Sequence, residues 1–219
     1  MCGRLSIATP QDQLEMRFEA TAAGAIEAHY NAYPNHDRYP LPVITAGEPN
    51  HITLRWWGIV PRWWTRDRRG LINIQHETLR DKNTFRQDFA KRRCLVLADG
   101  FYEWQGDKSN KTPYYIHLAS GEPFAFAGLY EDNAVDGQPL PALAIITTTP
   151  NEVMAPIHRR MPVILGRGDE KRWLHPDTSL EAALDMLEHP VAANAMEAYP
   201  VSKAVNRPVV DGPHLREPV

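Results

Sequence analysis

The second residue of the chain offers the most distinctive chemistry in the sequence. The chain begins Met1-Cys2-Gly3-Arg4, and methionine aminopeptidases remove Met1 when the next residue is small. Cys2 would then carry a thiol beside a free α-amine, and such amines are partly neutral and nucleophilic near pH 7. The amine can condense with an aldehyde to an imine, on whose carbon the thiol closes to form a thiazolidine. If Met1 is retained, the amine lies in a peptide bond and this chemistry is impossible.

Three further segments place polar side chains where they could assist such an adduct. Glu103 follows an apolar run and lies between aromatic residues, so it is either a buried group for proton transfer or an exposed acid on a strand. His158 precedes an apolar run and suits a switchable donor or a helix cap. Arg160 suits a phosphate or the open surface. Asn73 has apolar neighbours, and a buried asparagine can position a substrate.

Positive charge is concentrated in one part of the chain. The formal net charge is −3, yet residues 55–93 contain eleven Lys and Arg against four Asp and Glu, together with four of the 6 tryptophans. Arginines beside aromatic side chains can hold phosphates while unpaired bases stack. The alternative is a solvated basic surface. We expect at least one of Trp56 and Trp57 in the core, whereas Trp63 and Trp64 follow a proline in a segment typical of a loop.

The elements that must position these residues are short. The 219 residues include 19 prolines and 13 glycines, spread along the chain, which favours many strands and turns. Helical patterns cover residues 11–18, 84–93, 170–174 and 179–187, with one helical turn at 151–155. Strand patterns cover residues 42–45, 52–57, 94–98, 114–118, 124–130 and 143–147, and a further apolar run covers 161–165. We predict one α+β domain over residues 1–219, with curved, barrel-like, mostly antiparallel sheets and short flanking helices.

Several classes of protein are disfavoured by what the sequence lacks. It has no run of about 18 apolar residues and no signal-peptide pattern, so we expect an intracellular, cytoplasmic protein without a membrane partner. Cys94 opens an apolar run, where cysteine is usually a small buried side chain rather than half of a disulfide. The histidines show no metal-ligand spacing, and no glycine-rich phosphate loop is present. We therefore expect neither a metal nor a cofactor.

Taken in order, these segments resemble the SRAP family of SOS-response-associated peptidases, also called abasic-site processing proteins. The resemblance covers nearly the whole chain. The matching runs are Met1-Cys2-Gly3-Arg4, Tyr30-Asn31-Ala32-Tyr33-Pro34, Trp57-Gly58-Ile59-Val60-Pro61 with Trp63-Trp64, Asn73 with Glu77-Thr78, Asp99-Gly100-Phe101-Tyr102-Glu103-Trp104, His158-Arg159-Arg160-Met161-Pro162, and Pro200-Val201-Ser202 with Val205-Asn206.

The resemblance implies that the protein binds single-stranded DNA and captures the ring-opened sugar of an abasic site on Cys2, giving a crosslink that protects the lesion in the DNA damage response. A monomer suffices for this chemistry, so we expect a monomer. The resemblance assigns acid–base chemistry to Glu103, contact with the sugar hydroxyls and ring opening to His158, and orientation of Cys2 or the sugar to Asn73. The remaining residues would contact or shape the DNA: Arg4 and Arg160 at phosphates, Trp63, Trp64 and Trp104 at the strand, Pro34 as a wedge between bases, and Thr147 in support.

The chain departs from the family pattern at one place. The family usually has Asn-Ala-Arg before Glu-Thr, whereas this chain has Asn73-Ile74-Gln75. Gln75 therefore replaces an arginine that would contact DNA, and His76 or Arg80 could compensate.

Two other functions stay open from the residues. An N-terminal cysteine with Glu and His could act as a peptidase, including removal of its own Met1 or a short leader, and would need no aldehyde. A non-covalent single-strand binding module would instead use the basic, tryptophan-rich segment and would tolerate the loss of Cys2.

Overall fold

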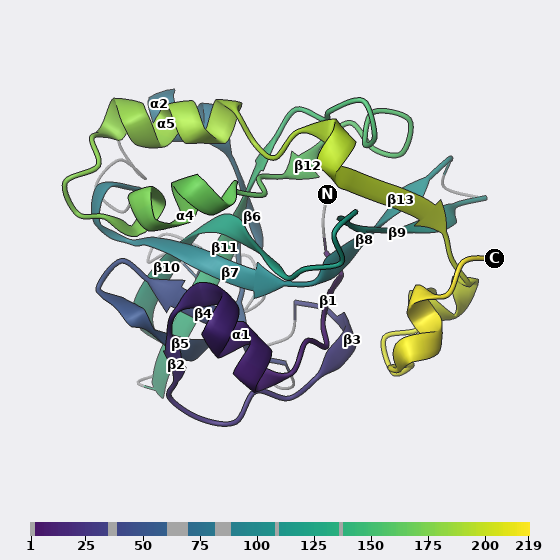
Figure 1. The fold of residues 1–219 in the computed structure, drawn as a ribbon, viewed down its shortest axis with the longest axis horizontal. Helices are drawn as coiled ribbons and strands as arrows, with labels where there is room; N and C mark the ends of the chain where they lie inside the picture. The colour runs from purple at the N-terminus through teal and green to yellow at the C-terminus, as the bar shows by residue number, and fades with distance from the viewer. Residues whose placement is uncertain (1–2, 35–38, 61–69, 82–88, 108–109, 136–137) are drawn as a thin grey trace.

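The computed structural model describes residues 3–34, 39–60, 70–81, 89–107, 110–135 and 138–219 (Figure 1). Within these residues, the smaller of two sheets has the strand order β13-β9-β8-β1-β3 with every neighbouring pair antiparallel. Its strands are β1 Leu5–Ile7, β3 His29–Ala32, β8 Gly100–Gln105, β9 Thr112–Leu118 and β13 Met196–Pro200.

The larger sheet has the order β12-β11-β10-β7-β4-β5-β2, and β6 pairs with β11. Its strands are β2 Thr21–Ala22, β4 Leu41–Thr45, β5 Glu48–Trp57, β6 Asn73–Gln75, β7 Arg93–Ala98, β10 Phe124–Val135, β11 Gln138–Thr148 and β12 Met161–Pro162. Strand β11 also pairs in parallel with β5, Ala142 with Trp56 and Leu143 with Trp57. These two strands are not neighbours in the strand order, so the pairing curves the sheet into a ring. The predicted α+β class with curved, mostly antiparallel sheets is confirmed, and the larger sheet is ring-like rather than a complete barrel.

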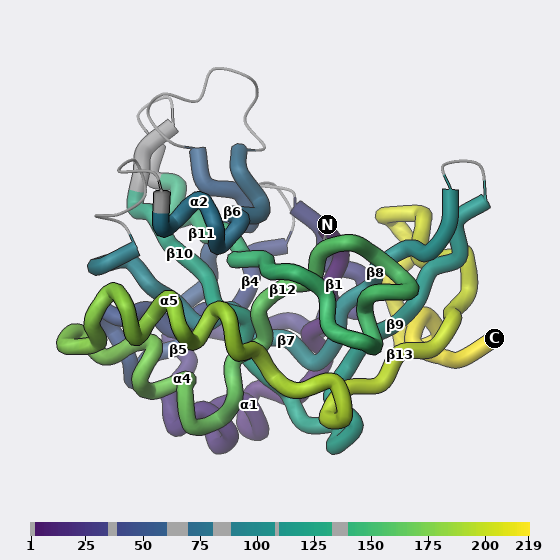
Figure 2. The backbone as a smooth tube through the Cα atoms, turned by 90° about the horizontal axis from the view of Figure 1, so that it is seen from above, coloured from purple at the N-terminus to yellow at the C-terminus, as the bar shows by residue number. Residues whose placement is uncertain are grey.

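The helices are short, as the sequence predicts. They are α1 Gln11–Phe18, α2 His76–Asp81, α4 Arg167–Leu174 and α5 Leu180–Glu188, with 3-10 turns η1 Ala193–Ala195, η2 Lys203–Asn206 and η3 Pro213–Arg216. In α5 the apolar side chains fall on one buried face, and Ser179 accepts a hydrogen bond from the Ala182 N–H at the helix start. Figures 1 and 2 show α4 and α5 at one end of the molecule and the C-terminal turns at the other.

Helix α1 has the predicted span, and its start is held by residues from outside the helix. The residue before it, Pro10, provides no side-chain cap. The Thr9 hydroxyl and backbone N–H instead donate to Asp99, which also accepts from the Ser6 hydroxyl at 2.6 Å and the Ala8 N–H at 2.7 Å. A single buried carboxylate therefore holds the strand β1, the start of α1 and the bend between β7 and β8 together.

The helix predicted from Thr84 to about Arg93 was extended too far toward the C-terminus. Thr84 lies outside the described residues, but Arg93 itself opens β7. Its side chain is 1% exposed and donates to backbone carbonyls of Phe89, Ala90, Trp173 and His175. These carbonyls lie at helix ends, where no intrahelical donor is available, so Arg93 joins two helix ends to the sheet.

Two apolar clusters fill the described residues. The main cluster runs through both sheets, and Trp57 and Cys94 belong to it, which confirms the buried tryptophan and the buried free thiol expected from the sequence. The second cluster contains Tyr102, Tyr115, Val201, Val205 and Leu215. It packs the segment that follows β13 against the smaller sheet.

Candidate functional site

Strand β8 carries Glu103 and Trp104 on opposite faces of the smaller sheet. Side chains alternate along a strand, so Glu103 shares a face with Phe101 of the main core, whereas Trp104 shares a face with Tyr102 of the second cluster. Glu103 is 4% exposed, and its Oε1 accepts the Trp104 N–H at 3.3 Å. Glu103 is therefore a buried carboxyl group, and the alternative of an exposed acid is wrong.

The start of the chain runs alongside β8 toward Glu103. Leu5 pairs with Phe101 in antiparallel register, and the Arg4 carbonyl accepts the Tyr102 N–H at 3.0 Å. Continued by one residue, this register sets Gly3 opposite Glu103. The residue before Gly3 in the sequence is Cys2, which, like Trp63 and Trp64, lies outside the described residues.

His158 belongs to the turn between β11 and β12 of the larger sheet, and this turn contacts the smaller sheet. The Gln105 side chain at the end of β8 donates to the Pro156 carbonyl at 3.0 Å. The His158 N–H donates to the Met154 carbonyl at 2.9 Å. His158 Nδ1 lies 3.1 Å from both the backbone nitrogen and the carbonyl oxygen of Arg160. The backbone of Arg160 therefore fixes the orientation of the imidazole ring.

Asn73 and Thr147 come from adjacent parallel strands. Asn73 pairs with Ile145, and Gln75 pairs with Thr147. Thr147 is fully buried, and its hydroxyl donates to the Ile74 carbonyl at 3.4 Å. Asn73 is half-buried, whereas Gln75 is exposed. The short strand β6 therefore places Asn73 and Gln75 beside the end of β11, and the His158 turn follows that end.

Arg160 contacts an acid that the sequence reasoning did not select. Its guanidinium donates to both carboxylate oxygens of Glu77 at 2.6 and 2.9 Å and to the Thr147 carbonyl at 2.6 Å. The hydrogen bond from Arg160 lowers the pKa of Glu77, and partial burial opposes this effect. Glu77 follows Asn73 in the family pattern, but the sequence does not indicate that Arg160 is its partner.

Arg4 and Trp104 are held by the C-terminal segment. Arg4 Nη1 donates to Asn31 Oδ1 at 2.7 Å and to the Val205 carbonyl at 2.6 Å. The Trp104 indole donates to Asn206 Oδ1 at 2.7 Å, and the Arg4 guanidinium lies 6.0 Å from the Trp104 ring. Burial lowers the pKa of Arg4, and the charge of Tyr33 opposes this effect.

The remaining candidates lie on the surface or near it. Pro34 is half-buried and follows Tyr33, whose ring lies 5.4 Å from the Arg4 guanidinium. Arg80 is exposed and pairs with Glu188 of α5 at 2.8 Å. Pro34 is therefore adjacent in sequence to a residue that lies beside Arg4, whereas the Arg80 side chain is directed toward α5.

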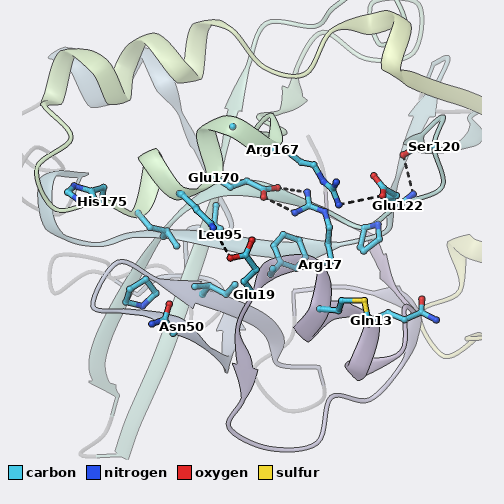
Figure 3. A pocket seen from close by; sticks show the side chains of 18 of the residues that line it. Gln13, Arg17, Glu19, Asn50, Leu95, Ser120, Glu122, Arg167, Glu170 and His175 are labelled. Atoms are coloured by element: carbon cyan, nitrogen blue, oxygen red, sulfur yellow. Dashed lines mark hydrogen bonds and ion pairs between the residues drawn. The ribbon is translucent and has the colours of Figure 1, made fainter.

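A separate cavity of about 1000 Å³ lies between α1 and α4 (Figure 3). Arg17 and Glu170 face each other there in a bidentate ion pair of 2.9 and 2.8 Å. None of the described candidate residues lines this cavity.

No group of three or more His, Cys, Asp and Glu side chains in the described part of the chain could hold a metal ion. Likewise, none of the described helices has the length and apolar character needed to cross a membrane.

Comparison with known proteins gives one consistent result. A family profile described as "SOS response associated peptidase (SRAP)" matches residues 1–208. The chain is 40% identical over 224 residues to the abasic site processing protein YoqW of Bacillus subtilis (strain 168), covering 99% of both chains. It is 28% identical over 230 residues to the abasic site processing protein YedK of Escherichia coli (strain K12), covering 100% of both. A solved structure of a Bacteroides thetaiotaomicron protein matches with a TM-score of 0.85 and 26% identity, covering 100% of both chains. The fold, the ordered motifs and these relatives agree, and the chain belongs to the SOS response associated peptidase (SRAP) family.

Proposed function

We propose that this protein captures abasic sites in single-stranded DNA as a covalent thiazolidine on Cys2, after removal of Met1, and so protects the lesion during the DNA damage response. The named activity of the relatives supports the substrate: YoqW and YedK are both abasic site processing proteins. The protein acts as an intracellular monomer in this proposal, because one chain supplies every residue that the chemistry needs.

The reaction needs no oxidant and no cofactor. The Cys2 amine attacks the aldehyde carbon of the ring-opened deoxyribose, and loss of one water gives an imine. The Cys2 sulfur then bonds to the imine carbon, and the thiol proton ends on the nitrogen. One water is released overall, and the reverse reaction consumes one. Either half of the cysteine alone gives only a labile adduct, so both groups are required.

The observation that carries the proposal is the position of Glu103 beside the start of the chain. The nearly fully buried Glu103 directly follows Tyr102, whose N–H donates to the Arg4 carbonyl, and Cys2 is two residues before Arg4 in the sequence. Imine formation requires a proton for the departing hydroxyl group, and reversal requires its return, which suits a single acid–base group such as Glu103. His158 would contact the sugar hydroxyls and promote ring opening, and Asn73 would orient Cys2 or the opened sugar.

The DNA strand would pass over residues from both sheets. Arg4 and Arg160 would meet phosphates, with Arg160 steadied by the carbonyl of Thr147. Trp104, Trp63 and Trp64 would stack against or shape the strand. Pro34 would separate bases beside Arg4. Gln75 and Arg80 would contact the strand from the side of α2.

The deciding experiment mixes the purified protein with single-stranded DNA that carries one abasic site. Denaturing electrophoresis should show a heat-stable shifted band without added reductant, and intact mass should show that Met1 is absent and that one water is lost per adduct. The band should vanish for Cys2→Ala and for undamaged DNA.

Other outcomes point to other functions. If Met1 is absent and no band forms, the covalent proposal is wrong. Equal, reversible binding by the wild type and Cys2→Ala would indicate a non-covalent binding module. Cleavage of peptide bonds without any aldehyde would indicate a peptidase, and a Met1-retaining form that processes itself would be its simplest version.

A further inference from the structure

The turn η2, Lys203–Asn206, holds two of the proposed DNA-contacting residues at once. The Val205 carbonyl accepts from Arg4, and the next residue, Asn206, accepts from the Trp104 indole. These bonds join residues 201 and 102 positions apart in the chain. Two consecutive residues of one turn therefore fix both the cation and the aromatic ring on this face of the smaller sheet.

Asn31 fixes the turn to the sheet. Asn31 is 2% exposed. Its side-chain amide group donates to the carbonyls of Val205, Arg207 and Val210 at 3.3, 3.2 and 2.8 Å. The same side chain accepts from Arg4 at 2.7 Å. A buried, multiply bonded asparagine of this kind gives the segment one defined position. The segment from η2 to Val210 is therefore fixed against the smaller sheet by these hydrogen bonds.

The segment carries two exposed basic side chains. Lys203 and Arg207 are both exposed, and the described residues place no carboxylate within ion-pair distance of either. Side chains three residues apart eclipse each other in a 3-10 helix. Lys203 therefore projects from the same side of the turn as Asn206, whose side chain touches Trp104. Figures 1 and 2 both show the C-terminal turns at the end of the molecule that contains β8 and β9.

We propose that η2 together with Arg207, hereafter the C-terminal bank, is a second phosphate-contacting surface for the single strand. It extends the path of the strand past Trp104, outside the basic segment at residues 55–93. This inference rests on the proposed function for the identity of the strand. Lys203 and Arg207 supply the phosphate contacts, and Val205 and Asn206 act as positioning residues for Arg4 and Trp104.

The charge contacts have a specific signature in salt. Each phosphate neutralised on a single strand lowers the slope of log K against log salt by about 0.7. Lys203→Gln and Arg207→Gln should each make that slope shallower by about 0.7, and the double variant by about 1.4. The measurement is fluorescence anisotropy with an undamaged oligonucleotide at several salt concentrations.

Lys171→Gln is the matched control, because Lys171 is also exposed and lies on α4 at the other end of the molecule. It should keep the wild-type slope. Unchanged slopes for both bank variants, with Cys2-dependent crosslinking by the wild type, would overturn the bank and leave the proposed function standing. Shallower slopes without any crosslink by the wild type would support the bank and contradict the covalent proposal.

The positioning role of Asn206 is tested separately with a double-mutant cycle. Asn206→Ala removes the acceptor of the Trp104 indole, and Trp104→Phe removes the donor. Asn206→Ala should weaken binding several-fold in the wild type but much less in Trp104→Phe, since the bond is already absent there. Additive losses in the double variant would show that Asn206 acts independently of Trp104 and would overturn this assignment. Thermal melting of each variant checks that the fold is intact.

Discussion

Arg160 and Glu77, 83 residues apart in the chain, form a bidentate ion pair at 2.6 and 2.9 Å. The same guanidinium also donates to the Thr147 carbonyl. The pair ties α2 to the end of β11 and holds the arginine in one orientation. A phosphate that reaches Arg160 therefore meets a cation that an acid has already oriented, and it competes with that acid.

The Arg160–Glu77 pair should contribute stability that depends on pH. The folded protein lowers the pKa of Glu77 from 4.5, so the pair stabilises the fold above that value, and its contribution disappears as pH falls through the lower, folded value. Glu77→Gln should cost about 0.2–1 kcal/mol at pH 7, because the carboxylate is partly exposed and screened. Urea unfolding of both proteins from pH 7 to pH 3 should show the difference shrinking. A difference that grows toward acid would contradict this assignment.

Replacing the buried acid should slow the chemistry. Glu103→Gln keeps the shape of the side chain but removes its capacity for proton transfer. The rate of crosslink formation with abasic DNA should fall about 10²–10⁴-fold in single-turnover measurements, and crosslink reversal should slow as well.

The melting temperature of Glu103→Gln is the control for folding. A variant that melts normally and crosslinks at the wild-type rate would remove Glu103 from the mechanism and leave Cys2 without its acid–base partner.

Arg17 and Glu170 should matter for stability rather than for capture. Their side chains are 10% and 7% exposed, and removal of one partner leaves a buried charge. Glu170→Ala should therefore lower the free energy of unfolding by about 3–5 kcal/mol. Urea denaturation measures the loss.

Lys171→Ala is the comparison for that measurement, because Lys171 forms an exposed pair with Glu19 and should change stability little. Equal effects of Glu170→Ala and Lys171→Ala would mean that burial does not govern the Arg17–Glu170 pair.

The two thiols should differ sharply in reactivity. Cys94 is fully buried, and burial raises the pKa of its thiol, so little reactive thiolate forms. A thiol reagent should label native wild-type protein once, at Cys2, and should leave native Cys2→Ala unlabelled until it unfolds. Intact mass gives the count directly. Rapid labelling of native Cys2→Ala would show that the core around Cys94 opens readily.

The sequence predicted those parts of the fold that depend on local pattern. Residues Leu180–Glu188 form a helix because their apolar spacing and the Ser179 cap act within a few turns. The span Gln11–Phe18 follows in the same way. The sequence left the burial of Glu103 undecided, because its aromatic neighbours favour a desolvated side chain whereas alternation along a strand favours an exposed one.

Pairings between distant segments could not be read from local pattern. Arg93 was predicted at the end of a helix, yet it opens a strand and its four carbonyl partners lie at the ends of two helices. Asn31 is similar: its motif was noted, but its role depends on carbonyls more than 170 residues away. Such contacts are set by how the sheets meet, which no short window of sequence encodes.

If the proposed crosslink through Cys2 forms, the Asp99 carboxylate has a mechanical consequence. Any force on the attached strand would enter the chain just before β1, which lies between β8 and β3. That load runs along the strand, so it shears the flanking hydrogen bonds together instead of opening them one at a time. The bonds from Ser6, Ala8 and Thr9 to Asp99 reinforce the same stretch. We therefore expect the tethered domain to resist pulling by enzymes that travel along DNA.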